Sequence, residues 1–151
     1  MAKFCIIDAS VSLKWYFDDE ECVDSARRLL NDYGNGQITI IVPNFFFAEV
    51  ANALNVAVIR KRLKEKKAFE FLQNILELNI LTLSDSNLLL LAWRFARTYN
   101  CSVYDTTYIA GAYNLGCNIY TGDRKLYNTL GTKLSLVKWI GDYSYIDLQD
   151  E

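Results

Sequence analysis

The stretch Lys3-Phe4-Cys5-Ile6-Ile7-Asp8 is a short apolar run that ends in a carboxylate. Its length and composition predict a buried β-strand. Strand-like and helical patterns alternate along the rest of the chain, which is typical of a parallel sheet covered by helices on both faces. Because ligands bind beyond the carboxyl ends of the strands in such sheets, Asp8 stands where a functional site is expected.

The other elements are predicted from apolar periodicity and turn signals. We expect strands over 37–42, 80–83, 117–120 and 134–137, and helices over 18–31, 44–62, 65–77, 84–99, 104–115 and 123–130. Tyr33-Gly34-Asn35-Gly36 predicts a turn, and Asn44 is a candidate N-cap. With 151 residues, no internal repeat and no linker-like segment, residues 1–151 are predicted to form one α/β domain.

The composition restricts the chemistry open to the chain. Histidine is absent, which excludes Ser-His-Asp and Cys-His catalytic groups and histidine-ligated metal sites. The four cysteines form no C-x-x-C pair and are expected to be thiols, with a disulfide as the alternative in a hyperthermophile. No stretch is typical of a signal peptide or a membrane span, so we expect a cytoplasmic protein with no membrane contact.

Four acidic residues lie where a site could form. Asp8, Asp105 and Asp123 each follow a strand-like segment. Each also has an ordinary alternative, as a helix N-cap or as a first-turn acid that favours the helix dipole. Glu49 differs, because its neighbours from Phe45 to Ala51 are apolar and leave its carboxylate no evident solvated face.

Convergence of these acids would imply a metal site. Neighbouring carboxylates repel one another and raise their own pKa values, and a divalent cation relieves that repulsion. Carboxylates favour Mg²⁺ or Mn²⁺, which can orient a nucleophilic water and stabilise a phosphoryl transition state.

Arg124 and Lys125 beside Asp123 either contact a phosphate or form a solvated helix face. The basic segment 60–67 either guides RNA or is a solvated bend, and the net charge of −2 argues against a broad basic surface.

Four segments taken together resemble the motif series of PIN domains, in the family's order and at its usual intervals. They are Cys5-Ile6-Ile7-Asp8-Ala9-Ser10-Val11, Phe47-Ala48-Glu49-Val50-Ala51-Asn52-Ala53-Leu54, Val103-Tyr104-Asp105-Thr106-Thr107-Tyr108-Ile109-Ala110 and Tyr120-Thr121-Gly122-Asp123-Arg124-Lys125-Leu126. The resemblance covers essentially the whole chain and is nearest to VapC-type toxins of prokaryotic toxin–antitoxin pairs.

The resemblance implies a parallel sheet flanked by helices and Mg²⁺- or Mn²⁺-dependent endonucleolytic cleavage of RNA. It makes Asp8, Glu49, Asp105 and Asp123 the catalytic and metal-binding acids, and Ser10 a small hydroxyl residue that contacts the metal or its water. It further implies an RNA substrate, a protein antitoxin and a homodimer.

The aromatic residues also suggest a partner. The run from Phe45 to Phe47 and the tail residues Trp139, Tyr143 and Tyr145 exceed what one surface would be expected to hide. We therefore interpret them as a hint of oligomer or partner contacts.

Two competing functions remain open from the sequence. In a phosphoaspartate enzyme Asp8 would be the nucleophile, but haloacid-dehalogenase-like phosphatases place a second aspartate where Ser10 stands, and a receiver domain needs neighbouring acids that are absent here. An RNA-binding or scaffold module without catalysis would be favoured by the loss of a motif acid, and all four are present.

Overall fold

Five parallel strands form one sheet in the computed structural model, which describes residues 3–144. The strands are β1 (Lys3–Ile7), β2 (Ile38–Pro43), β3 (Leu81–Leu83), β4 (Asn118–Thr121) and β5 (Val137–Trp139), in the spatial order β3-β2-β1-β4-β5. Every neighbouring pair is parallel. The order reverses at β1, so the connections on its two sides run over opposite faces of the sheet.

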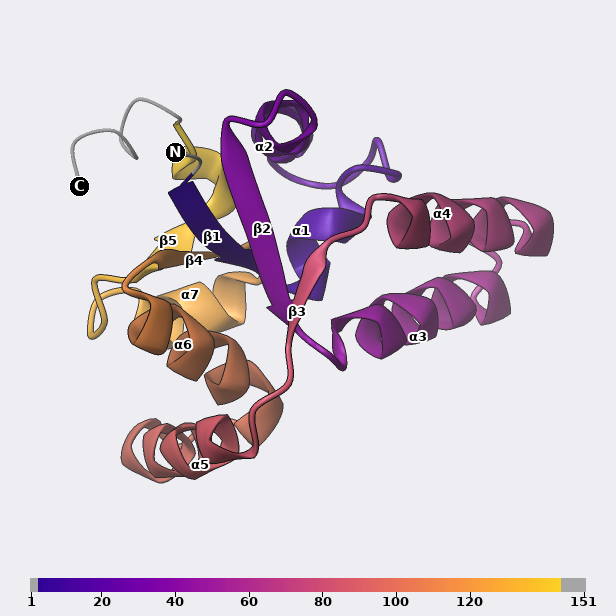
Figure 1. Ribbon diagram of the computed structural model, residues 1–151. Coiled ribbons are helices and arrows are strands. Elements are labelled where there is room, and N and C mark those ends of the chain that lie inside the picture. Colours follow the sequence, from indigo (N-terminus) through magenta and orange to yellow (C-terminus); the bar gives the residue numbers. More distant parts are fainter. Residues whose placement is uncertain (1–2, 145–151) are drawn as a thin grey trace.

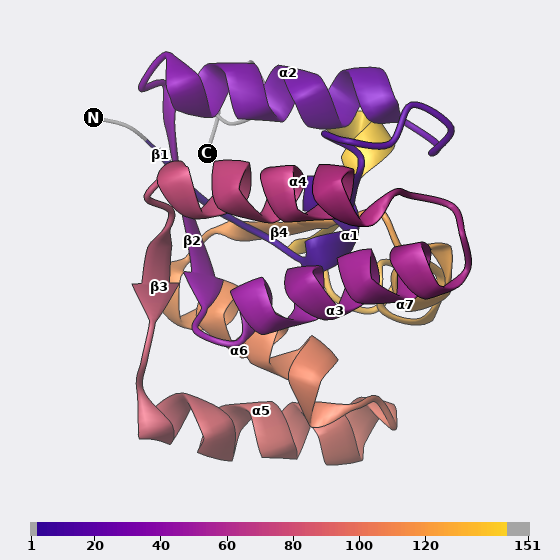
Figure 2. The same ribbon diagram turned by 90° about the vertical axis from the view of Figure 1, so that its right-hand side faces the viewer.

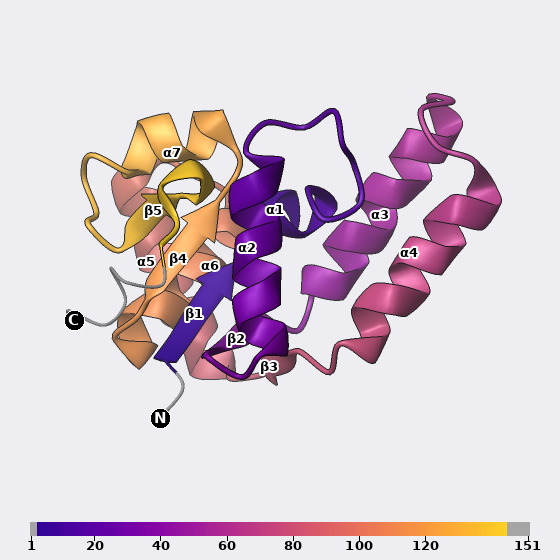
Figure 3. The same ribbon diagram turned by 90° about the horizontal axis from the view of Figure 1, so that it is seen from above.

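The helices cover both faces, which confirms the predicted fold class. They are α1 (Ala9–Leu13), α2 (Val23–Gly34), α3 (Phe46–Ile59), α4 (Glu65–Glu77), α5 (Ser86–Tyr99), α6 (Val103–Leu115), α7 (Arg124–Leu130) and the 3-10 helix η1 (Ile140–Asp142). Figures 1 and 2 show α2 on one side of the sheet and α5 and α6 on the other. Figure 3 shows α3 and α4 as a pair of neighbouring helices that projects from the sheet. None of the helices between residues 3 and 144 is long and apolar enough to cross a membrane.

Helix α6 packs directly on the centre of the sheet, and a glycine permits the close approach. A Cβ added at Gly111 would lie 2.8 Å from Cδ1 of Leu83 and 3.0 Å from Cδ1 of Ile6. Ile6 is fully buried in the central strand β1. The position of α6, and with it that of Asp105 in its first turn, is therefore determined by tight packing against the sheet.

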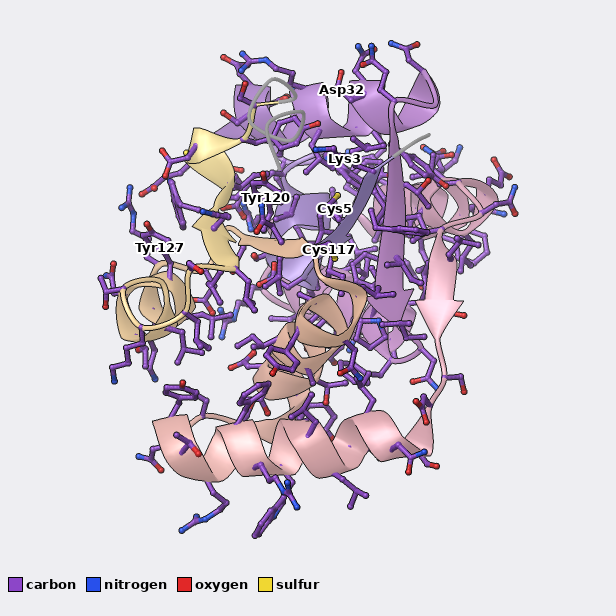
Figure 4. All side chains as sticks on the ribbon, turned by 60° about the vertical axis from the view of Figure 1, so that its left-hand side comes forward. Lys3, Cys5, Asp32, Cys117, Tyr120 and Tyr127 are labelled. Atoms are coloured by element: carbon purple, nitrogen blue, oxygen red, sulfur yellow. The ribbon has the colours of Figure 1, made fainter. Side chains whose placement is uncertain are left out.

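A buried polar contact fixes α2 to the C-terminal part of the described chain. The Tyr143 hydroxyl donates a hydrogen bond to Oδ2 of Asp32 at 2.7 Å, and both residues are buried. Figure 4 shows Asp32 on α2. Burial and the bond to Asp32 hold the pKa of Tyr143 well above its ordinary value, so the phenol stays protonated as a donor. Asp32 is thereby satisfied although it is buried.

The aromatic residues are buried more completely than the sequence suggested. Trp139 and Tyr143 are less than a tenth exposed, and Phe46 is fully buried. Phe45 and Phe47 are half-buried, so the fold hides part of this aromatic set, and the expected partner contacts stay a prediction. Tyr145 lies outside the described residues. The exposed aromatic residues between residues 3 and 144 are Phe4, Phe69, Trp93, Tyr104 and Tyr113.

Several element ends differ from the predicted ones. The helix expected from Asp18 begins at Val23, because the acids of the preceding loop pair with cations from other elements. These pairs are Arg27–Asp18 at 2.6 Å, Arg62–Asp19 at 2.8 Å, Arg62–Glu20 at 3.2 Å and Arg124–Glu21 at 3.1 Å. Asn44 is not an N-cap, since α3 begins after Phe45 with no side-chain cap. No disulfide joins the four cysteines, as expected.

Gly111→Val should destabilise the protein by roughly 1–3 kcal/mol, because the added side chain has no room between α6 and the sheet. Urea denaturation followed by circular dichroism measures the change. Gly34→Ala is the matched control: nothing lies within 4 Å of its added Cβ, at the last residue of α2. We expect this control to be neutral or stabilising by up to ~1 kcal/mol. Equal stabilities for the two variants would contradict the close packing of α6.

Candidate active site

The carboxyl edge of the sheet brings Asp8 and Asp123 to neighbouring positions. Asp8 directly follows β1, and Asp123 lies two residues after β4. The two strands pair in parallel with Ile7 opposite Tyr120, and the Asp8 amide donates to the carbonyl of Tyr120 at 3.3 Å. The shared register therefore places both carboxylates at one point of the sheet edge, as expected for α/β proteins.

The carboxylate of Asp8 is buried and accepts two hydroxyl hydrogen bonds. Ser10 donates to Oδ1 and Thr121 donates to Oδ2. Ser10 Oγ in turn accepts from the Gly122 amide at 2.8 Å. Burial raises the pKa of Asp8 from 3.8 to about 6; the hydroxyl bonds lower it, and the charge of Asp123 raises it further. These contacts hold the carboxylate in one orientation.

Glu49 reaches the same region from helix α3, where it lies in the first turn. Its Oε1 accepts a hydrogen bond of 2.6 Å from the hydroxyl of Tyr108 on α6. Burial raises the pKa of Glu49, the Tyr108 bond lowers it, and the charge of Asp105 raises it. Burial and the same bond keep the pKa of Tyr108 far above its ordinary value, so Tyr108 acts only as a donor.

Asp105 and Asp123 line a hollow of about 330 Å³ together with Lys125. Asp123 caps α7 through Oδ1, which accepts from the amides of Lys125 at 2.9 Å and Leu126 at 3.3 Å. Burial raises the pKa of Asp105, Ser102 lowers it, the charge of Asp123 raises it and Lys125 lowers it. Both residues thus keep the local roles that the sequence offered as alternatives, while also facing one hollow.

The four predicted acids form one electrostatic group. Asp123 raises the pKa of both Asp8 and Asp105, and Asp105 raises that of Glu49. Within residues 3–144, no three acids or cysteines are close enough, as placed, to hold one metal ion. The oxygen donors suit a hard divalent cation, but direct binding by three of these side chains would require some of them to rotate.

The basic residues near the site differ in whether an acid already pairs with them, and so in how readily they could contact a phosphate. Arg124 pairs with Glu21 at 3.1 Å, and its guanidinium lies 4.5 Å from the centroid of the Trp139 ring. Lys125 lines the hollow instead. Arg62, in the basic bend between α3 and α4, is held by Asp19 and Glu20. Arg124 would have to leave Glu21 to contact a phosphate, whereas Lys125 already faces the acids.

Sequence reasoning gave no role to three residues of this site. Thr121 and Tyr108 belong to the quoted motifs, but their bonds to Asp8 and Glu49 span 113 and 59 residues of sequence. Lys14 is only 3% exposed, and a Cβ added at Gly122 would lie 2.2 Å from its Cε. Its ammonium is 4.0 Å from Glu20. The sequence signal for a buried Lys14 was its position directly before the apolar run Trp15-Tyr16-Phe17.

The arrangement of four acids on a parallel α/β sheet can be compared with known proteins. The family model described as "PIN domain" matches residues 5–130. The chain belongs to the PIN-domain family. Members of this family are typically nucleases, and the match includes all four acids of the site. A search of curated proteins gave no match.

Two solved PIN-like structures share the fold. PAE2754 from Pyrobaculum aerophilum superimposes with a TM-score of 0.70 at 20% identity, and the match covers 100% of each chain. VapC20 from Mycobacterium tuberculosis, a toxin that cleaves the sarcin–ricin loop, has a TM-score of 0.61 at 16% identity, covering 83% of this chain and 95% of that one. At these identities the likeness concerns the fold.

The metal-free protein should lose stability as the pH rises from about 4 to 6, in contrast to the usual behaviour of a carboxylate. Because the folded pKa of Asp8 is raised from 3.8 to about 6, its contribution is largest below pH 4 and is lost as Asp8 ionises in the folded state. The difference corresponds to roughly 3 kcal/mol. Urea denaturation in EDTA between pH 4 and 7.5 measures it. Asp8→Asn should remove most of this slope, and parallel profiles for both proteins would contradict the assignment.

Proposed function

We propose that this PIN-domain protein is a metal-dependent endoribonuclease that hydrolyses RNA phosphodiester bonds, with Asp8, Glu49, Asp105 and Asp123 as its catalytic and metal-binding acids. One observation carries the proposal: carboxylates from four separate segments gather at the carboxyl edge of the sheet, where the charge of Asp123 raises the pKa values of Asp8 and Asp105 and the charge of Asp105 raises that of Glu49. Such repulsion is retained in proteins mainly where a function requires it.

Mg²⁺ or Mn²⁺ is the proposed cofactor. A divalent cation stabilises negative charge on a phosphoryl group and makes water a stronger nucleophile. Asp123 is exposed and Asp105 is partly buried beside the hollow, so both side chains have room to adjust. Asp8 is held by Ser10 and Thr121 and offers a fixed oxygen pair. The four side chains therefore combine one rigid donor with more adaptable ones.

The remaining residues of the site have positioning roles in this proposal. Ser10 links the Asp8 carboxylate to the Gly122 amide and so ties the loops after β1 and β4 together. Tyr108 holds Glu49, which either ligates the cation or aligns the attacking water. Lys125 contacts a phosphate group of the RNA, and Arg124 joins it only on leaving Glu21.

We further propose the biological setting of a toxin–antitoxin pair, with a homodimer and an inhibiting antitoxin protein. The fold shared with VapC20 and the exposed apolar side chains support this setting. On α5, Leu90 is 67% and Trp93 58% exposed, and on α4 Phe69 is 62% exposed. Leu90 and Trp93 lie one turn apart on α5, and exposed apolar patches of this kind mark surfaces that bind other proteins.

The purified protein should cleave a structured, end-labelled RNA pool in Mg²⁺ or Mn²⁺ but not in EDTA. Asp8→Asn and Asp105→Asn should each reduce the rate about 100-fold or more, because each removes part of several kcal/mol of transition-state stabilisation. Gel electrophoresis of the products at increasing times gives the rates.

Glu77→Gln is the matched control, since Glu77 is an exposed acid at the end of α4. It should cleave like the wild type. Cleavage that persists in both aspartate variants would identify a contaminant. Absence of cleavage, together with RNA binding that does not need metal, would favour the alternative of a PIN-like RNA-binding module without catalysis.

Mn²⁺ or Mg²⁺ should raise the melting temperature by roughly 5–10 °C at about 100 times its dissociation constant, because the cation binds only the folded state. Asp8→Asn should melt higher than the wild type without metal, since it removes a buried charge, and should show a smaller metal shift. Differential scanning fluorimetry with and without EDTA measures both effects. A destabilised Asp8→Asn variant with an intact metal shift would mean that Asp8 is only a structural residue.

A further inference from the structure

An exposed aromatic ring stands directly beside the acids. Tyr104 precedes Asp105 in the first turn of α6 and is 62% exposed. Most aromatic residues between residues 3 and 144 are buried or half-buried, so an open ring at this position is unusual for the chain. Tyr104 thus lies at the end of α6 that carries Asp105.

The Tyr104 ring is held in place by one contact. It meets the ring of Phe45 edge-to-face, with centroids 5.4 Å apart and planes at 90°. Phe45 makes a second edge-to-face contact with Tyr108, at 5.5 Å and 87°. Tyr108 in turn donates its hydrogen bond to Glu49. The exposed ring is therefore fixed by the same group of residues that positions a proposed catalytic acid, which is the property of a rigid contact surface.

A second hollow, of about 230 Å³, adjoins Phe45, the ring that Tyr104 contacts. Phe45 and Thr107 line it, together with Leu83, Leu88 and the polar residues Asn44 and Ser84. Thr107 lies one helical turn after Tyr104, so the two share a face of α6. The hollow therefore combines apolar walls with hydrogen-bonding groups next to an open aromatic face.

The charges around the acids do not by themselves favour binding of RNA. The net charge is −2, and Arg62 and Arg124 are paired with acids of the loop before α2. Attraction for phosphate close to the four acids is therefore modest. Stacking of a base on an aromatic side chain needs no net charge and contributes binding energy for each base, whatever its identity.

We propose that Tyr104, backed by Phe45, is a stacking platform for one unpaired nucleobase of the RNA next to the cleaved phosphate, with the adjoining hollow receiving the edge of that base. The inference rests on the proposed nuclease function and specifies its substrate class. A base within a duplex cannot stack on a protein side chain unless it is splayed out. The platform therefore selects RNA that is single-stranded at this position.

The test measures RNA binding without cleavage. Fluorescence anisotropy of a short, fluorescein-labelled single-stranded RNA of random sequence is recorded in EDTA for the wild type and for Tyr104→Ala, Tyr104→Phe and Tyr113→Ala. Tyr104→Ala should weaken binding roughly 5- to 150-fold, the range for loss of one stacked base. Tyr104→Phe keeps the ring and should bind like the wild type.

Tyr113 supplies a matched control on the same helix. It is 60% exposed and meets Phe95 edge-to-face at 5.8 Å, but it lies at the other end of α6 from the acids. Tyr113→Ala should leave binding unchanged. Melting temperatures of all variants separate a loss of fold from a loss of contact.

A second RNA probe separates stacking from other effects. On an otherwise identical strand of abasic ribose phosphates, the wild type and Tyr104→Ala should bind equally weakly. Equal affinities of the wild type and Tyr104→Ala for the normal strand, or equal losses in the two alanine variants, would overturn the inference, as would absence of binding by the wild type.

The binding test of Tyr104 and the cleavage test of the nuclease can fail independently of each other. Metal-dependent cleavage by a Tyr104→Ala protein that binds RNA normally would support the nuclease function and contradict the stacking role of Tyr104. Weakened binding by Tyr104→Ala, with no cleavage by the wild type or any variant, would support the stacking contact and contradict the nuclease function.

Discussion

The buried carboxylate of Asp8 is the feature on which the rest of the site depends. It lies at the end of the central strand, where Thr121 from the neighbouring strand β4 donates to one oxygen and Ser10 to the other. That arrangement requires the register of Ile7 with Tyr120, and the same register brings Asp123 alongside. Burial outweighs the hydroxyl bonds and raises the pKa to about 6, so an ionised Asp8 near neutral pH costs stability. A cation beside Asp8 would relieve that cost.

The other three acids show that a local structural role is compatible with the proposed functional role. Asp123 caps α7 and Asp105 occupies the first turn of α6, as the ordinary reading of each residue suggested. These local roles keep the side chains of Asp123 and Asp105 at the sheet edge, where they remain available for a site. Glu49 is held in a different way, by the phenol of Tyr108. A helix-capping interpretation is thus weak evidence against participation in a site when several such acids share one edge.

The central strands and the four acids could be predicted because each leaves a local mark on the sequence. The apolar run before Asp8 predicted β1 with the bounds that the structure has, and the apolar surroundings of Glu49 marked it as unusual. The pairings that position the site were not predictable, since Thr121 meets Asp8 across 113 residues. Local propensity also misjudged the start of α2, since Asp19 and Glu20 of the loop before it pair with Arg62, which lies 43 and 42 residues away in the sequence.

The distribution of charge constrains how this protein can hold an anionic polymer. Acids of the loop before α2 engage Arg27, Arg62 and Arg124, so these cations already have partners in the folded protein. Lys125 is left facing the hollow, opposite carboxylates that would repel a phosphate. Phosphate groups can approach such a cluster only if a cation reverses its local charge. For the proposed RNA substrate, contacts that do not need charge would add affinity beside the acids, and the exposed ring of Tyr104 next to Asp105 is placed to make one.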